Sequence, residues 1–188
     1  MKRVLAITGP SGAGKTCLSN YLREKYNYPY PVHTTTRERR ADDEAGFYNY
    51  ISVESFLDKV EKQEFLFYSG YKGRYYGILK SDFEEAFNSN MGLVINVNYM
   101  DLEQLSLIKE KYNMTIIQLT FKDIPKMIVE RTCERGQKPE DTAFRIEVAT
   151  RNEEAYKEQI KKYVDITCYT DELSFEEEIK FIEEKLEK

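Results

Sequence analysis

Cysteine and histidine are scarce in this sequence, and tryptophan is absent. The three cysteines, Cys17, Cys133 and Cys168, form no C-x-x-C pair and stand at no metal-binding spacing from His33, the single histidine. An odd cysteine count without such spacing argues against a disulfide framework and against a zinc site. The fifteen tyrosines and ten phenylalanines indicate aromatic packing rather than a particular function.

The chain also lacks a long apolar run, an internal repeat and a low-complexity linker. A membrane-spanning helix needs about 20 consecutive apolar residues, and no segment approaches that length. The first eight residues, Met-Lys-Arg-Val-Leu-Ala-Ile-Thr, lead directly into a glycine-rich motif without a leader pattern. We therefore expect a soluble cytoplasmic protein with no membrane partner.

Positive charge is not in excess, because 33 acidic residues outnumber 28 lysines and arginines and give a formal net charge of -5. Binding to a nucleic-acid backbone depends on clustered cations, so we expect no nucleic-acid partner. The arginines nevertheless gather in two groups, which favours two small anionic sites: Arg37, Arg39 and Arg40, and then Arg131, Arg135, Arg145 and Arg151.

The length of 188 residues and the 41% hydrophobic content indicate one compact domain with a small inserted lobe. Short apolar runs separated by enough chain for helical crossovers are typical of buried parallel strands. Four such runs predict a parallel sheet and an α/β fold: residues 4–8, 93–97, 115–119 and 164–168.

Several helices are also indicated. Residues 15–26 carry apolar side chains at helical spacing. Two capping-box patterns and one Asp-x-Pro pattern, whose helix would run to about residue 135, mark further helix starts: Ser81-x-x-Glu84, Ser174-x-x-Glu177, and Asp123 with Pro125. Residues 135–139, Arg-Gly-Gln-Lys-Pro, interrupt two helical patterns and predict a mobile loop.

The segment from about residue 33 to residue 80 has a different pattern. Aromatic clusters at residues 47–51 and 65–68 precede Gly70, Gly73 and Gly77. Such a pattern indicates short antiparallel strands joined by turns. We interpret this segment as a β-rich lobe inserted into the α/β core.

The strongest motif is Gly9-Pro-Ser-Gly-Ala-Gly-Lys15-Thr16, which lies between the first predicted strand and the first predicted helix. Glycines let the backbone turn its N–H groups inward, the helix offers its positive end, and Lys15 adds a mobile cation. The motif predicts that ATP phosphates bind along residues 11–15 and that the Thr16 hydroxyl binds Mg²⁺.

Further motifs follow in order: His33-Thr-Thr-Thr-Arg37-Glu-Arg-Arg40, then Gly46 and Tyr48, and then Gly73-Arg-Tyr-Tyr76-Gly77. Together with the phosphate motif and the later arginines, this series resembles the guanylate kinase family over nearly the whole chain. The resemblance implies a P-loop kinase core with a parallel sheet flanked by helices, formed by residues 1–32 and 81–188. It also implies an acceptor-binding lobe at about 33–80 and a helical lid at about 131–150.

The resemblance assigns roles to individual residues. Lys15, Arg135 and Arg145 would contact the transferred phosphoryl group, and Arg131 would flank the ATP base. The phosphate-binding residues would be Ser11, Gly12, Ala13, Gly14, Lys15 and Thr16.

On the acceptor side, Arg37 and Arg40 would clamp the phosphate of a monophosphate, because guanidinium groups pair with phosphate in a two-pronged way. Tyr48 and Tyr76 match tyrosines that donate to the same phosphate, and Asp43 matches an acidic family position.

The chain departs from the family where guanine is recognised. The family has a glutamate, two serines and an aspartate at positions occupied here by Phe67, Ile78, His33 and Asn98. A buried donor that loses its partner costs about 1–3 kcal/mol, so Phe67 puts guanine recognition of the family type in doubt. Asn96 also replaces a family aspartate that supports Mg²⁺ binding, and an amide is a weaker partner for this ion.

Three functions follow from these observations. The first is ATP-dependent phosphorylation of a nucleoside monophosphate, with GMP the leading acceptor. The second is a kinase for another nucleotide or a ribose phosphate, since ribose bisphosphate phosphokinases also carry asparagine at the position of Asn96. The third is a non-catalytic phospho-ligand or protein-binding module, although such modules commonly lose the phosphate loop. The sequence contains no base-recognition motif of a switch GTPase, and it gives no indication of oligomeric state.

Each of two aromatic residues has two alternative roles. His33 either bonds the acceptor base or packs at the hinge of the lobe, and Tyr169 either stacks on the adenine of ATP or is a plain surface residue.

Overall fold

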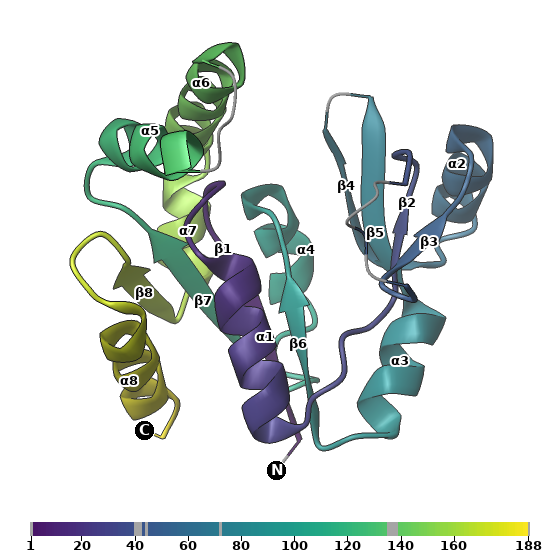
Figure 1. Cartoon of the computed structure of the whole chain (residues 1–188). Helices are drawn as coiled ribbons and strands as arrows, with labels where there is room; N and C mark the ends of the chain where they lie inside the picture. Colours follow the sequence, from purple (N-terminus) through teal and green to yellow (C-terminus); the bar gives the residue numbers. More distant parts are fainter. Residues whose placement is uncertain (1, 40–42, 44, 72, 135–138, 188) are drawn as a thin grey trace.

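The computed structural model describes residues 2–39, 43, 45–71, 73–134 and 139–187. A central parallel sheet has the strand order β6-β1-β7-β8 (Figure 1). Its strands are β1 (Arg3–Thr8), β6 (Gly92–Asn96), β7 (Met114–Thr120) and β8 (Ile166–Tyr169). All four predicted strands are confirmed, with ends that differ by no more than two residues.

Helices cover both faces of this sheet, which explains the uninterrupted apolar runs of its strands. Leu5 and Ile7 pack toward α1 (Lys15–Tyr26) and α8 (Phe175–Leu186). Val4 and Ala6 point to the other face, where the covering elements include α3 (Lys80–Asn88), α4 (Leu102–Ser106) and α7 (Lys157–Tyr163). The α/β architecture and the first predicted helix are therefore confirmed.

A second sheet, with the order β3-β2-β5-β4, lies beside the first (Figure 1). Its strands are β2 (His33–Thr35), β3 (Tyr48–Tyr50), β4 (Phe65–Tyr71) and β5 (Arg74–Leu79). The pairs β2–β5 and β4–β5 are antiparallel, as predicted, whereas β2 and β3 are parallel.

The same region contains a helix that the sequence pattern did not predict, α2 (Val53–Glu61). Ser52 caps it by accepting a hydrogen bond from the backbone N–H of Ser55 at 3.1 Å. Phe56 anchors the helix on the sheet by stacking on Phe65. The aromatic clusters on either side of this short helix are typical of strands, so the sequence pattern predicted strands and turns throughout the segment.

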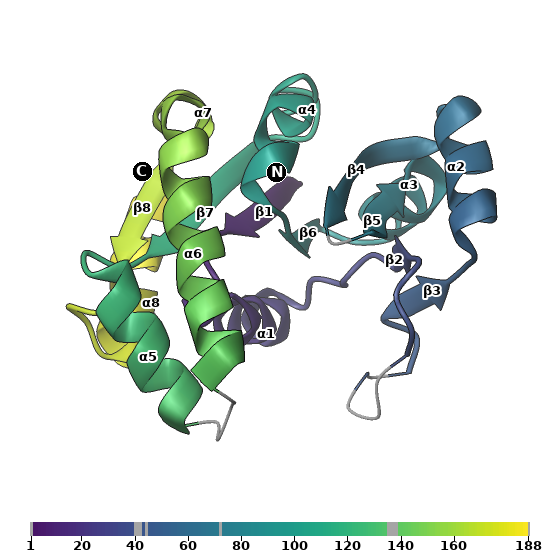
Figure 2. The same ribbon diagram turned by 90° about the horizontal axis from the view of Figure 1, so that it is seen from above.

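Helices α5 (Ile124–Glu134) and α6 (Pro139–Ala155) stand on the opposite side of the molecule from the second sheet (Figure 2). The predicted start of α5 is confirmed, because the Asp123 carboxylate accepts from the backbone N–H of Lys126 at 3.1 Å. The predicted loop at 135–139 falls largely on residues 135–138, outside the described residues. Among the described helices, none combines the length and the apolar character that a membrane span requires.

The two predicted capping boxes differ in outcome. Ser174 and Glu177 form the expected reciprocal pair at the start of α8. The prediction at Ser81 was wrong, because α3 already begins at Lys80 with Leu79 as its N-cap. Ser81 therefore lies inside the first turn, where its hydroxyl bonds the carboxylate of Asp82.

This difference gives a stability prediction with a built-in control. Ser174→Ala removes an N-cap acceptor and should lower the free energy of unfolding by about 1 kcal/mol. Ser81→Ala should change it by less than about 0.5 kcal/mol, since this exposed serine caps nothing. Urea unfolding followed by circular dichroism measures both values. Equal losses in the two variants would contradict the assignment of the cap.

Candidate active site

The phosphate loop, residues 9–16, joins the carboxyl end of β1 to α1. Gly9 has a φ of +139°, and a Cβ built there would lie 1.9 Å from the carbonyl oxygen of Leu119 in β7. Gly12 and Gly14 also have positive φ, which glycine adopts without steric cost. Because Gly14 is the N-cap of α1, the unpaired N–H groups of the first helical turn face the loop. The loop is therefore a preformed cradle for an anion.

Lys15 stands at the centre of this loop. Its Nζ donates to the carbonyl oxygens of Gly9, at 2.7 Å, and Pro10, at 2.8 Å. Burial lowers the pKa of Lys15 to about 8. A phosphate in the cradle would favour the charged ammonium and raise this pKa again. Ser11 is exposed beside the cradle, whereas Ala13 is buried in the core.

Arg145 reaches the phosphate loop from α6. Its Nη1 donates to the hydroxyl of Ser11. Farther along α6, Glu153 accepts from Nε2 of Gln118 at 2.9 Å and from the hydroxyl of Thr120 at 2.8 Å, both on β7. These bonds tie the helix to the sheet and thereby fix the position of Arg145 over the loop.

Of the other predicted donor-side residues, Arg131 lies beside the same loop. Arg131, half-buried in the last turn of α5, has its Cβ 3.6 Å from the place where a Cβ on Gly12 would stand. Tyr169 ends β8 and is 40% exposed, with the ammonium of Lys122 over its ring at 5.5 Å. Arg135 lies outside the described residues.

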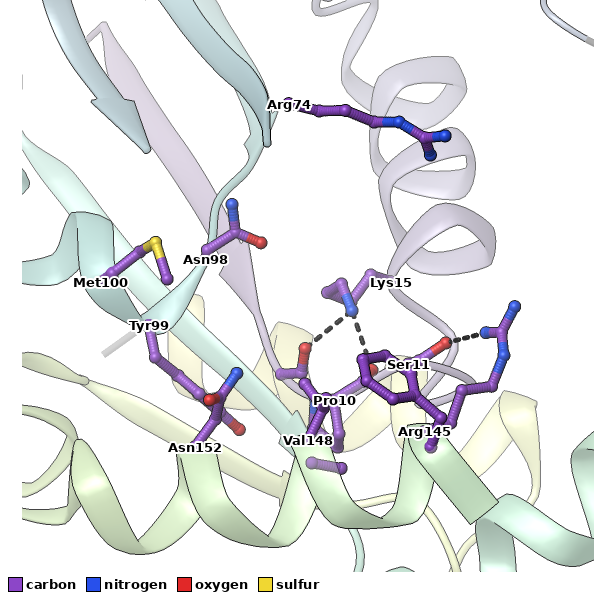
Figure 3. Close-up of a pocket in the computed structure, with 13 residues that line it drawn as sticks. Pro10, Ser11, Lys15, Arg74, Asn98, Tyr99, Met100, Arg145, Val148 and Asn152 are labelled. Atoms are coloured by element: carbon purple, nitrogen blue, oxygen red, sulfur yellow. Dashed lines mark hydrogen bonds between the residues drawn. The ribbon is translucent and has the colours of Figure 1, made fainter. Parts of the chain in front are cut away.

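A cleft with a volume of about 420 Å³ opens between the phosphate loop, α6 and the tip of the β4–β5 hairpin. Figure 3 shows Lys15 and Arg145 on one side of it and Arg74 on the other, with Asn98 and Asn152 along the wall. None of the described residues that line this cleft is acidic. The cleft therefore suits a ligand that carries several negative charges.

The lobe formed by the second sheet and α2 contains a preorganised arginine. The guanidinium of Arg37 binds the carboxylate of Asp43 in a two-pronged pair, at 2.6 Å from Nη1 and 2.5 Å from Nη2. Tyr50 donates to the same carboxylate at 2.6 Å, and the Tyr48 ring lies 4.6 Å from the guanidinium carbon. Hydrogen bonding to Asp43 raises the pKa of Arg37, so this side chain stays charged. Arg40, the second predicted clamp, lies outside the described residues.

The residues that replace the guanine-reading positions fall into two environments. Phe67 and Ile78 face each other across β4 and β5 and are buried in the core cluster on the Val4 face of the main sheet. Asn98 lines the cleft, and its Nδ2 donates to the hydroxyl of Ser69 at 3.0 Å. Phe67 and Ile78 thus belong to the core, whereas Asn98 is among the described residues that line the cleft.

Asp101 lies directly behind Asn98. Its carboxylate accepts from the backbone N–H of Asn98 at 2.7 Å, which closes the short 3₁₀ turn Tyr99–Asp101 after β6. Burial raises the pKa of Asp101 to about 6. This carboxyl group is 1% exposed, so it orients Asn98 and is not itself presented to a ligand.

His33 lies at the start of β2, where the chain passes from the core into the lobe. Its ring stacks on Tyr30 with centroids 4.8 Å apart, and Nδ1 donates to the carbonyl oxygen of Pro31 at 3.1 Å. Burial lowers the pKa of His33 to about 4, so the ring is neutral. Tyr76, half-buried on β5, faces Ser69 across the hairpin.

A magnesium ion would find neutral oxygen ligands here. Thr16 is exposed at the start of α1. Asn96, at the end of β6, donates to the hydroxyl of Ser19 at 3.3 Å, while its buried Oδ1 has no partner among the described residues. No cluster of three or more His, Cys, Asp or Glu side chains suited to a metal occurs in the described part of the chain. The ligand phosphates would therefore supply the negative charge around this ion.

Sequence reasoning missed Tyr50, Ser69 and Arg74. The Tyr48-x-Tyr50 spacing places both tyrosines on one side of β3, which indicates a shared target for them. Ser69 and Arg74 carry no such signal, because only the hairpin register shows which way their side chains point.

Comparisons with known proteins agree with this geometry. The sequence model of the guanylate kinase family matches residues 1–188. The chain is 33% identical to a guanylate kinase of Thermotoga maritima over 150 residues, which cover 78% of this chain and 71% of that protein. It is 30% identical to a guanylate kinase of Helicobacter pylori, covering 94% and 83% of the two chains. The crystal structure of an Anaplasma phagocytophilum guanylate kinase shares the fold, with a TM-score of 0.68, 16% identity, and 99% and 85% coverage.

The lowered pKa of Lys15 gives a pH prediction. Above about pH 8 the free protein holds Lys15 largely neutral, whereas bound phosphate restores its charge. ATP binding at pH 8.5 should therefore take up a fraction of a proton, and the affinity should fall as the pH rises further. Calorimetry in buffers of different ionisation enthalpy measures this uptake. In Lys15→Arg the uptake should disappear, because a guanidinium stays charged; an unchanged uptake would assign the proton to another group.

Proposed function

Because the chain belongs to the guanylate kinase family, we propose that it transfers the γ-phosphoryl group of ATP to a nucleoside monophosphate, with GMP the leading acceptor. The observation that carries this proposal is the shared cleft, in which the phosphate loop and Arg145 face the acceptor lobe. Phosphoryl transfer depends on positioning and on positive charge more than on a covalent catalyst. The cleft offers both.

The donor phosphates bind in the loop. The N–H groups at the start of α1 and the Lys15 ammonium surround the β- and γ-phosphates, while Arg145 approaches from the lid side. In this arrangement the Lys15 ammonium exchanges its hydrogen bonds to the carbonyl oxygens of Gly9 and Pro10 for hydrogen bonds to phosphate oxygens. ATP phosphates and the Thr16 hydroxyl would hold a Mg²⁺ ion, which would supply positive charge to the phosphates, and the Asn96 amide lies nearby as a neutral oxygen donor.

The acceptor phosphate binds at Arg37. Asp43 accepts from Nη1 and Nη2, and the carbonyl oxygen of Glu38 also accepts from Nη1, which leaves the edge built on Nε for the acceptor phosphate. Asp43 thus orients the guanidinium and leaves an edge that matches two phosphate oxygens. Tyr48 lies against the same guanidinium, and Tyr76 completes the phosphate site.

The base then meets the Asn98 wall of the cleft. With Nδ2 engaged by Ser69, Asn98 presents its carbonyl oxygen, which accepts from an N–H donor of the base. Guanine carries such donors at N1 and N2, which supports GMP. A single amide acceptor discriminates less than a carboxylate pair, so we expect modest base selectivity.

The burial of Phe67 and Ile78 also supports a second acceptor class. Both side chains pack in the core and offer no hydrogen bond to a base, so a ribose phosphate or another nucleotide would lose no partner at these positions. The proposal therefore ranks GMP first and keeps these acceptors as the alternative.

An acceptor panel tests the proposal. ADP formation from ATP and Mg²⁺ is measured with GMP, AMP, CMP, UMP, ribose 5-phosphate and ribose 1,5-bisphosphate, with Lys15→Ala as the inactive control. We expect GMP to give the largest kcat/KM among the nucleotides, at most about 100-fold above AMP. The kinase proposal fails if no acceptor raises the rate above that of Lys15→Ala. A larger rate with a ribose phosphate would move the assignment to the alternative.

The role of Arg37 is tested by a charge-conserving change. Arg37→Lys keeps an ion pair with Asp43 but loses the fork, so the acceptor KM should rise about tenfold or more. The ATP dissociation constant should stay within about threefold of the parent value, because the cradle is untouched. Arg39→Lys, the same change at an exposed neighbour, should leave both constants unaltered. Equal losses for ATP and acceptor in Arg37→Lys would contradict this placement.

A further inference from the structure

The cations of the cleft differ in how they are held. Lys15 bonds two loop carbonyl groups, and Arg145 bonds Ser11. Arg74, which comes from the acceptor lobe, is exposed, and its side chain makes no hydrogen bond or ion pair with the described residues. Figure 3 shows its side chain extended across the mouth of the cleft, opposite Lys15 and Arg145. This guanidinium therefore has all its donors available to a ligand.

The register of the hairpin explains why Arg74 points this way. Successive side chains of a strand alternate between faces, so Arg74, Tyr76 and Ile78 share one face of β5. Their partners on β4 are Tyr71, Ser69 and Phe67. Along this face the inner end is apolar and buried, the middle carries the Ser69 and Tyr76 hydroxyls, and the tip carries a cation.

The spacing places Arg74 between the two phosphate sites. Residues two apart on a strand are separated by about 7 Å, so Arg74 lies about that distance beyond Tyr76 toward the tip. Tyr76 belongs to the proposed acceptor-phosphate site, and Lys15 lies across the cleft in the donor site. A fully extended arginine reaches the space between them.

From this geometry we infer that Arg74 is a further phosphate-binding residue, which contacts the oxygens where the donor and acceptor phosphates meet. The inference rests on the proposed phosphoryl transfer. In that step an acceptor-phosphate oxygen forms a bond to the γ-phosphorus, the bond from this phosphorus to the β–γ bridging oxygen breaks, and its electron pair remains on ADP. Arg74 neutralises the negative charge that accumulates when the two phosphates approach each other.

Loss of the Arg74 side chain should thus weaken the complex that holds donor and acceptor together more than the complex with either ligand alone. Arg74→Ala should lower kcat about 100-fold, with the ATP dissociation constant within about threefold of the parent value. Arg74→Lys should recover part of this loss, because it keeps the charge without the fork. Lys62→Ala, which removes an exposed cation elsewhere in the same lobe, serves as the matched control and should match the parent protein.

A binding measurement decides the inference without turnover. Adenosine and guanosine joined by five phosphates fill the donor and acceptor sites together, and calorimetry gives the affinity of this probe. We expect Arg74→Ala to weaken the probe at least about tenfold while ATP alone is unaffected. Unchanged affinity for the probe, or an equal loss for ATP alone, overturns the inference.

Different experimental outcomes would contradict the proposed function and the role of Arg74. If the parent protein phosphorylates no acceptor but Arg74→Ala still weakens the linked probe, the proposed function falls and the role of Arg74 stands. If the parent protein is active and Arg74→Ala equals it in both rate and probe affinity, only the role of Arg74 falls.

Discussion

The site depends first on the close approach of the phosphate loop to β7. Gly9 carries the chain over the carbonyl group of Leu119 at a distance that no side chain permits. Because the loop stays this close to the sheet, α1 begins directly above the strand ends, and its free N–H groups converge on one point. The same edge of β7 holds α6 through Glu153, so Arg145 is aimed at that point too. The geometry of the proposed donor site therefore follows from one steric constraint shared by a loop and a helix.

The acceptor side depends on the β4–β5 hairpin, which has two functions. Its inner end inserts Phe67 and Ile78 into the core and so attaches the second sheet to the first. Its outer end carries Arg74 to the cleft, and Tyr76 lies on the same face of β5. The use of the inner end for packing explains the absence of base-reading polar groups at these two positions. Residues that attach the hairpin to the core are thereby unavailable for the base recognition that the proposed function would use.

Much of the fold was predictable because its signals are local. The apolar runs, the helical spacing at residues 15–26 and the capping box at Ser174 depend on neighbours in the sequence. The Ser81 pattern failed because the hairpin continues into α3, and the N-cap is Leu79, two residues earlier. Helix α2 was missed because its aromatic surroundings reflect packing between elements. The phosphate loop was predictable to the residue, whereas Arg74 needed the hairpin register, and the pairing of Arg37 with Asp43 needed the folded lobe.

The distribution of acidic groups gives the site its electrostatic character. A protein with a net charge of -5 keeps carboxylates off the described lining of the cleft and places them behind the groups that face it. Asp43 stands behind Arg37, Asp101 behind Asn98, and both are largely buried. In these positions a carboxylate orients its partner through short bonds without repelling an incoming phosphate. The end of β6 likewise carries no carboxylate, because residue 96 is an asparagine. Ligand phosphates would therefore be the main source of negative charge for a bound cation there. Charge complementarity between cleft and ligand is thus achieved by where the acids lie, not by the overall charge of the chain.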